Sequence, residues 1–347
     1  VNSTAGEIAV GVDTAGAGAS VSTVQVHKNV QAFIDKEADV YAAAAQPGSI
    51  HAYSGEHDAN GNFLLEEIHG VEVQATSNES VNNIAFGVDA GLYAGVAAAV
   101  TATVIQPNVE AWIGRAATVD ADSAGTPSAG GEKSPTNVNV SAVNHSMVND
   151  SATGIGIGAV GISGAVDVGR IHHFVWGHID NDADVKALYD IDVHGLSQKL
   201  VDSDTLAAGA GAVGLSGSVS VWNIGAPFNS EYMLNGTKMK ALQAGGTTVD
   251  QYGSAAADLV DGRLDKRFGK GTHNNKDLYS DLHAKDRPTG VIATIKQNAI
   301  LTAGDDIDVR AREWMLGDAS TGAAGIGVYA GVGAAVAIMN VHSDTDA

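Results

Sequence analysis

Two patterns of apolar and polar positions alternate along this chain. The first is a tract of small residues, nearly free of charge, and five copies of it align without gaps. With the valine after the tract as anchor, the copies are centred on Val21, Val100, Val166, Val219 and Val336. Glycine stands five positions before every anchor, at Gly16, Gly95, Gly161, Gly214 and Gly331. Agreement at fixed positions across five copies predicts an internal structural repeat, with these glycines as structural residues.

The second pattern alternates valine or isoleucine with polar residues. It occurs at Val71–Ala75, Val138–Ala142, Ile191–Gly195 and Ile307–Ala311, and a shorter relative occurs at Ala38–Ala42, Ala117–Ala121, Ala183–Ala187 and Thr237–Ala241. Alternation with period two predicts half-buried strands. The small-residue tract is apolar or tiny at all its positions, which predicts a strand covered on both faces.

No segment carries a sustained apolar stripe with a period of 3.6 residues. We therefore predict an all-β chain, an elongated and repetitive β-sheet array of solenoid type with closely packed Gly/Ala-rich strands and loop insertions. Residues 1–347 form one such array. Its approximate units are 9–80, 81–150, 151–203, 204–318 and a partial unit at 319–347.

The anchors lie 79, 66, 53 and 117 residues apart, so the units differ by insertions. The first insertion is 46–69, where Asp58–Asn62 predicts a turn between two extended arms. The second is a Gly/Pro/Ser-rich loop at 121–137, and the third is 243–288.

Composition explains why glycine recurs. Glycine contributes 43 of 347 residues, while aromatic residues make up 5% and charged residues 17%. Sheets lined by glycine and alanine can approach more closely than the usual distance of about 10 Å. We therefore expect Gly95→Leu and Gly161→Leu to be far more damaging than Val73→Leu.

The charge balance narrows the function classes. Forty acidic against 19 basic side chains give a net charge of −21, which disfavours nucleic acid as a partner. The absence of cysteine excludes disulfides, a thiolate nucleophile and Cys-ligated zinc. The charge-free runs 90–109, 151–166, 205–230 and 319–343 consist largely of small residues, and we do not expect them to insert into a membrane. No basic segment follows Val1, so we expect a mature chain or an internal fragment.

Motifs that resemble catalytic or cofactor sites have structural explanations. G-x-G-x-x-G occurs at 156–161 and 209–214, at the same phase of the repeat and with no helix after it, unlike a dinucleotide site. Ser163 and Ser216 also occupy equivalent repeat positions, which argues against a nucleophile. We predict no catalytic and no cofactor-binding residue, and hence no enzyme.

Histidines and acidic turns are the candidate metal ligands. In a strand, His172, Trp176 and His178 would share one face and His173 would lie opposite. No carboxylate or cysteine lies at a convincing ligand spacing from that face. The acidic turn 180–184 and the acidic residues of 305–308 suit either calcium or simple solvation. We assign no metal site, and calcium is the only cofactor considered.

Residues 262–288 hold seven of the 19 basic side chains. This island is either a solvated loop or a docking surface for a neighbouring copy or a glycan. The candidate contact residues are Arg263, Lys266, Arg267, Phe268, Lys270 and Tyr279.

The segments 156–168, 208–221 and 322–341 resemble the Gly/Ala-rich repeats of very large bacterial surface exoproteins, the filamentous-haemagglutinin-like and leukotoxin-like adhesins. The resemblance covers essentially the whole chain except 243–288. It implies an extracellular, cell-surface location and a structural role, and it carries no active-site residue over to this chain.

Three functions are therefore considered. The favoured one is a segment of an extracellular adhesin or a self-assembling filament or sheath subunit, whose partners are other copies added end to end or laterally, because exposed strand edges pair with other chains. The second is a module that binds a glycan or protein ligand on a host or neighbouring cell through 46–69 and 243–288. The third, an enzyme, requires carboxylates clustered on one strand face, and the sequence offers no convincing set.

Overall fold

The computed structural model describes residues 1–12, 14–42, 49–122, 136–225, 231–234, 237–240 and 290–347. These residues form strands and turns and contain no helix, so the predicted all-β class is confirmed. The strands are β1 (Asn2–Gly11), β2 (Ala15–Ile34), β3 (Asp39–Tyr41), β4 (Ile50–His57), β5 (Phe63–Ile68), β6 (Gly70–Gly91), β7 (Ala94–Ile113), β8 (Thr118–Asp120), β9 (Asn137–Ile157), β10 (Val160–Ile171), β11 (Phe174–Ile179), β12 (Asp184–Lys186), β13 (Ile191–Ile224), β14 (Glu231–Leu234), β15 (Thr237–Lys240), β16 (Gly290–Ile295), β17 (Ile300–Thr302), β18 (Ile307–Val341) and β19 (Thr345–Asp346).

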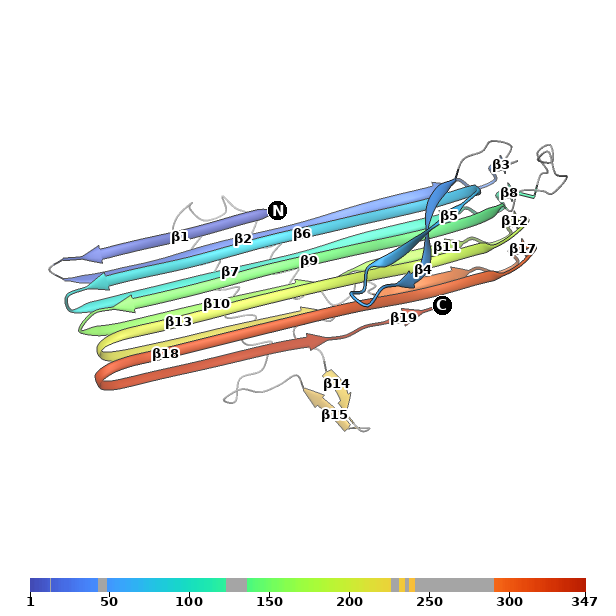
Figure 1. Cartoon of the computed structure of the whole chain (residues 1–347). Coiled ribbons are helices and arrows are strands. Elements are labelled where there is room, and N and C mark those ends of the chain that lie inside the picture. The colour runs from blue at the N-terminus through green and yellow to red at the C-terminus, as the bar shows by residue number, and fades with distance from the viewer. Residues whose placement is uncertain (13, 43–48, 123–135, 226–230, 235–236, 241–289) are drawn as a thin grey trace.

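The long strands run side by side in two layers (Figure 1). One layer contains β1, β6, β9 and the first parts of β13 and β18, and the other contains β2, β7, β10 and the last parts of β13 and β18. All these pairings are parallel. Tight turns join the layers at one end, called the turn end below, and β13 and β18 pass through this turn as single strands. At the other end, β3, β8, β12 and β17 form a short third sheet.

The predicted repeat is confirmed by the strand register. Val21 pairs with Val100, Val100 with Val166, Val166 with Val219 and Val219 with Val336. The five repeat glycines pair in the same succession, from Gly16 to Gly331. The alternating valine pattern aligns across β6, β9, β13 and β18 as well.

One predicted member of the shorter pattern is wrong. Its fourth copy is β17, which pairs with β12 in the third sheet and centres on Leu301. The segment 237–240 instead forms β15, which pairs antiparallel with β14. Met239 between two lysines matches the alternating pattern in sequence, but its strand pairs with the neighbouring β14 and not with the third sheet.

Glycine allows the layers to approach closely at the turn end. A Cβ added to Gly95 would lie 2.5 Å from the backbone nitrogen of Ile157 in the opposite layer, and one added to Gly161 would lie 2.5 Å from that of Ala210. The buried alanines between the layers belong to the same region; they are Ala85, Ala99, Ala152, Ala165 and Ala207. Backbone contacts replace a hydrocarbon core here, as the composition predicts.

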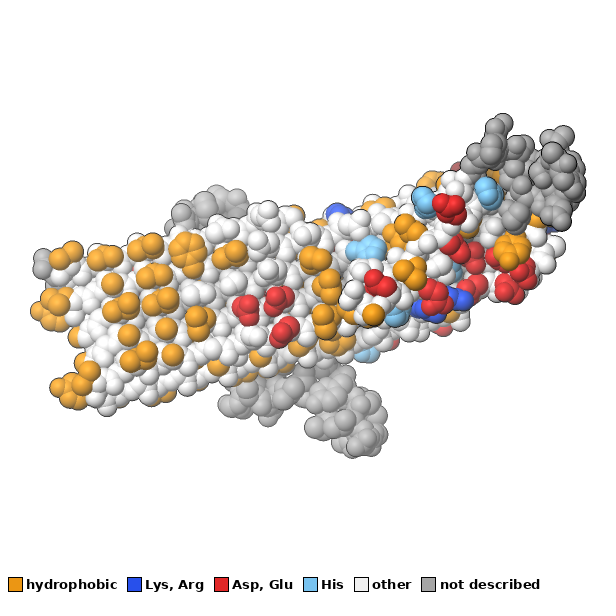
Figure 2. Space-filling model, viewed as in Figure 1, with side chains coloured by type: hydrophobic (Ala, Val, Ile, Leu, Met, Phe, Trp, Pro, Cys, Tyr) orange, Lys and Arg blue, Asp and Glu red, His pale blue; other side chains and the backbone are white. Residues whose placement is uncertain are grey.

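The expectation that the small-residue strands are covered on both faces is wrong at the turn end. The outward-facing Val96, Ile162, Leu215 and Val332 are 36%, 38%, 39% and 58% exposed. From the anchor onward the same face of β7 is covered, because Val100, Ala102 and Val104 are buried. Figure 2 shows the opposite face, the outer face of the first layer with the β4–β5 hairpin, where apolar side chains also gather at the turn end. On the inner strands β7, β10 and β13, the part beyond the anchor is therefore covered on both sides.

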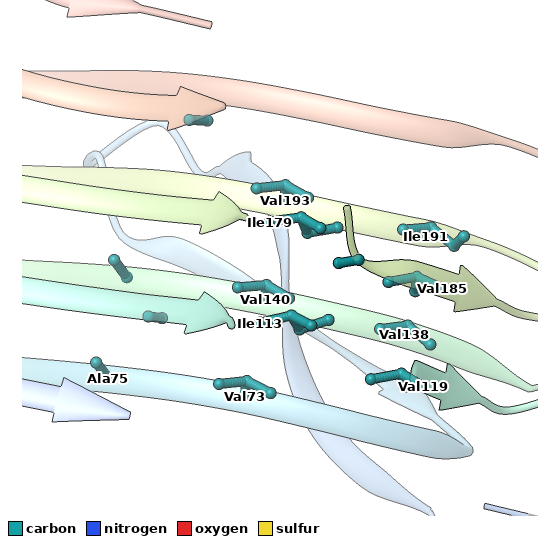
Figure 3. Packing of buried hydrophobic residues seen from close by; sticks show 14 of the residues in the cluster. Val73, Ala75, Ile113, Val119, Val138, Val140, Ile179, Val185, Ile191 and Val193 are labelled. Atoms are coloured by element: carbon teal, nitrogen blue, oxygen red, sulfur yellow. The ribbon is translucent and has the colours of Figure 1, made fainter. Parts of the chain in front are cut away.

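The hydrophobic core lies at the end away from the turns (Figure 3). There the two layers enclose larger side chains, including Val73, Val140, Ile113 and Ile179, and the third sheet adds Val119 and Val185. Each corner that leads into this third sheet contains one residue with a positive φ: Glu37, Ala116, Asp182 or Asn298.

The insertion at 46–69 contains the predicted turn between two arms. Strands β4 and β5 pair antiparallel, and the backbone nitrogen of Asp58 donates to the carbonyl of Asn62. The hairpin packs against the first layer, because Tyr53 and Phe63 contact buried Val143 and Leu196.

Candidate functional site

The outer edges of the stack are the first candidate site. Among the described strands, β18 pairs only with β13, while β1 pairs only with β6 and β2 only with β7. Each edge therefore presents backbone groups that no described strand pairs with.

Side-chain ladders reach both edges. On the outer face of the second layer, Ala17, Val96, Ile162, Leu215 and Val332 occupy one row of directly paired positions. Ala17 and Val332, which end this row, are both exposed. A further strand added in register at either edge would extend the row with another small or apolar side chain.

A polar seam lies inside the stack beyond the alanines. The carboxylate of buried Asp167 accepts hydrogen bonds from Thr101 Oγ1 at 2.7 Å, from Trp222 Nε1 at 2.6 Å and from the hydroxyl of Ser203. Burial, and then the charge of Asp167, raises the pKa of Asp150 well above its usual range. A seam of this kind favours one register, because a shifted strand would leave buried polar groups without partners.

A buried ion pair forms the second polar group of the interior. Lys199 Nζ on β13 donates to Glu313 Oε1 on β18 and lies 2.9 Å from His173 Nε2. Burial lowers the pKa of Lys199 to about 8, and it lowers that of His173 well below its usual range. The pair joins the last two units of the stack. The sequence analysis missed both polar groups, because each is assembled from different units and no local motif marks it.

The predicted histidine arrangement is confirmed only for Trp176 and His178, because His172 and His173 lie between β10 and β11 and not in a strand, and the side chains do not gather as metal ligands. Trp176 and His178 share a face and stack with ring centroids 3.9 Å apart, whereas His173 points into the interior. Burial, and then the charge of Lys296, lowers the pKa of His178 to about 4. Within the described part of the chain, no group of three ligand residues forms around these histidines.

The acidic turns behave differently from each other. Asp180 and Asp184 pair with lysines, at 2.6 Å from Lys296 and 3.1 Å from Lys186. Asp308 lies with Asp192 and His194 of β13, and the ligand atoms of these three residues are all within 4.8 Å of one another. The sequence analysis placed Asp308 with Asp305 and Asp306 and missed this group. Alignment of Ile191–Gly195 with Ile307–Ala311 contained the signal, since it sets Asp192 beside Asp308.

The two G-x-G-x-x-G segments occupy the turn end, and the backbone after each continues as a strand. Ser163 and Ser216 pair with each other in register, as expected for structural residues. Arg263, Lys266, Arg267, Phe268, Lys270 and Tyr279, the candidate contact residues, lie outside the described residues.

Comparisons with known proteins add no relative. A scan against protein-family models, a search of curated proteins and a search of solved structures each found no match to this chain. Among the described residues, no helix has the length and apolar character required to cross a membrane.

Proposed function

We propose that this chain is a non-enzymatic, extracellular structural segment, a β-solenoid rod of a cell-surface adhesin or filament. In this proposal, the rod grows when copies add to one another at their outer edges. The resemblance of the repeats to surface adhesins supports the location and the class of protein.

The in-register stack is the observation that carries the proposal. Five units repeat the same backbone path, with Gly16 to Gly331 in one row. The outer edge of β18 therefore has the same backbone form as the edge of β13 with which β18 pairs. In a copy added in register, Val332 of one chain would lie beside Ala17 of the next. Such a head-to-tail contact does not close on itself and can propagate.

Charge pairs at this contact test both the assembly and its register. Val332 and Ala17 are exposed, so a charged side chain is tolerated at either position in the separate chain. Like charges directly opposite each other across paired strands are destabilising, whereas opposite charges stabilise. The double variant Ala17→Lys/Val332→Lys should assemble poorly, and the matched variant Ala17→Asp/Val332→Lys should recover.

Negative-stain electron microscopy at low and high protein concentration measures the result. Filaments or end-to-end strings of the unmodified chain, lost with two lysines and restored with the opposite charges, would support the proposal. Uniform single rods at both concentrations would refute self-assembly. Strings unaffected by either double variant would refute the proposed register.

A further inference from the structure

Three potential metal ligands converge on the outer face of the first layer, beneath the β4–β5 hairpin. Asp192 and His194 are two positions apart on β13 and therefore face the same side. Asp308 is the in-register partner of Asp192 on β18. The ligand atoms of the three side chains lie within 4.8 Å of one another, and two neighbouring strands fix their backbones.

One nitrogen of the His194 imidazole forms no hydrogen bond. The side chain is buried; Nδ1 lies 3.4 Å from the hydroxyl of Ser141, and Nε2 forms no hydrogen bond. Nε2 lies 4.0 Å from Asp308 Oδ2, which exceeds hydrogen-bond distance. A buried nitrogen left in this state costs free energy unless a ligand satisfies it.

The hairpin places no side chain at this nitrogen. Gly55 of β4 has a φ of 73°, and a Cβ at this position would lie only 2.8 Å from His194 Nε2. Glycine therefore permits the hairpin to cover the imidazole without a side chain at the nitrogen.

The surroundings of the three side chains are acidic. Burial, together with the charges of Glu66, Asp190 and Asp308, raises the pKa of Asp192 to about 6, and the charge of His194 opposes this rise. Arg310 compensates part of this negative charge, since its Nε lies 2.5 Å from Asp308 Oδ2. Its guanidinium is shared, since it also pairs with Glu56.

We propose that Asp192, His194 and Asp308 bind one divalent transition-metal ion, with Zn²⁺ as the best match. An imidazole nitrogen and carboxylate oxygens are zinc ligands, and water would take the fourth position. Calcium fits less well, because it takes six to eight oxygen ligands. Coordination at about 2.0–2.2 Å requires the ligand atoms to move closer together. The partly exposed Asp308, on the outermost described strand of the layer, can make this movement.

The bound ion would link β13 to β18 and hold the last unit against the stack. This inference does not depend on the proposed assembly. It rests on the separate chain alone.

Calorimetric titration of Zn²⁺ into the metal-free full chain tests the site, with Co²⁺ absorption as a second readout of nitrogen and oxygen ligands. One ion per chain is expected. His194→Ala and Asp308→Asn should each weaken zinc binding by about 10-fold or more. Even the loss of a residue that only hydrogen-bonds to a metal ligand lowers metal affinity by about 10–100-fold. The control His342→Ala removes a histidine that lies 3.2 Å from Asp344 on an exposed part of the chain, and it should bind zinc normally.

Arg310→Gln provides a change in the opposite direction. It frees Asp308 from its cation, so zinc should bind more tightly, whereas a merely structural ion-pair network predicts no gain. The proposal is overturned if the unmodified chain takes up no zinc, or if Asp308→Asn and His194→Ala bind it as well as the unmodified chain does. Asp308→Asn alone decides the matter if His194→Ala does not fold, since Asp308 is partly exposed and its replacement is isosteric.

Discussion

The close approach of the two layers can be tested with two alanine substitutions on one strand. Gly161 and Gly164 both lie on β10, but Gly161 faces the opposite layer and Gly164 faces outward. A Cβ at Gly161 would lie 2.5 Å from the backbone nitrogen of Ala210, whereas the nearest atom to a Cβ at Gly164 is the oxygen of Gly217 at 4.0 Å. The register partner of Gly164 on β7 is already an alanine, Ala98.

The structure sets the size of the difference. Gly161→Ala would place the methyl carbon about 1 Å closer to backbone than an ordinary contact of about 3.5 Å. Overpacking of this kind costs about 1–3 kcal/mol. Gly164→Ala meets no such contact and should stabilise the fold by about 0.5 kcal/mol, because alanine restricts the unfolded chain. We therefore expect the free energies of unfolding of the two variants to differ by about 2.5 kcal/mol.

Urea denaturation followed by circular dichroism and tryptophan fluorescence measures this difference. With an m-value of about 3 kcal/mol/M, the two midpoints should lie about 0.8 M apart. Gly214→Ala and Gly217→Ala repeat the comparison one unit further on. A Cβ at Gly214 would lie 2.5 Å from the backbone oxygen of Ile326, whereas the nearest atom to a Cβ at Gly217 is 3.9 Å away. Equal midpoints within both pairs would refute the argument that glycine is required by close packing.

Four further substitutions test the buried polar groups and the corners. Asp150→Asn should stabilise the fold at pH 7 and lose this advantage toward pH 4. Because the pKa of Asp150 is raised, the folded state binds more protons than the unfolded state, so the stability of the unmodified chain falls as pH rises through that window. Urea midpoints of both proteins at the two pH values measure this difference. Glu313→Gln should lower the free energy of unfolding by about 3 kcal/mol at pH 7 and by less at pH 9.5. The reason is that the pKa of Lys199 is lowered to about 8, so at pH 9.5 the folded chain has already lost the charge that Glu313 pairs with. A loss of stability that does not depend on pH would contradict this assignment. Ala116→Gly should raise the free energy of unfolding by about 1 kcal/mol, because alanine at a φ of 56° is strained and glycine is not. Asn298→Gly at the equivalent corner should gain less, since asparagine tolerates a positive φ better than alanine does.

Sequence reasoning reached the features that depend on one repeat and its neighbour. The row from Gly16 to Gly331 was predictable, because an identical backbone contact in every unit demands the same residue type each time. The turn at Asp58–Asn62 was predictable from local turn chemistry.

Other features depend on which strands meet across the stack. Lys199 has no charged neighbour along its own strand that explains its burial, and its partner Glu313 lies 114 residues away. The left-handed corner at Ala116 was not predictable either, since alanine carries no signal for a positive φ. The wrong placement of 237–241 has the same origin, because a five-residue alternation does not distinguish a stacked strand from one arm of a hairpin.

The same contacts that set the register inside the chain bear on the proposed assembly. A strand added to the edge of β18 with a slip of one residue would turn its outward row inward. Ala17, which faces outward in its own copy, would then pair with an inward-facing position such as Gly331, so the layers of the two copies could not continue into each other. The glycine row therefore excludes odd slips. Val336 beside Val21 then distinguishes the remaining even registers, since only zero slip continues the row of anchor valines. On these grounds, copies that add by strand pairing should form filaments of one register rather than a mixture, and the charge-reversal pair at positions 17 and 332 reports on that register directly.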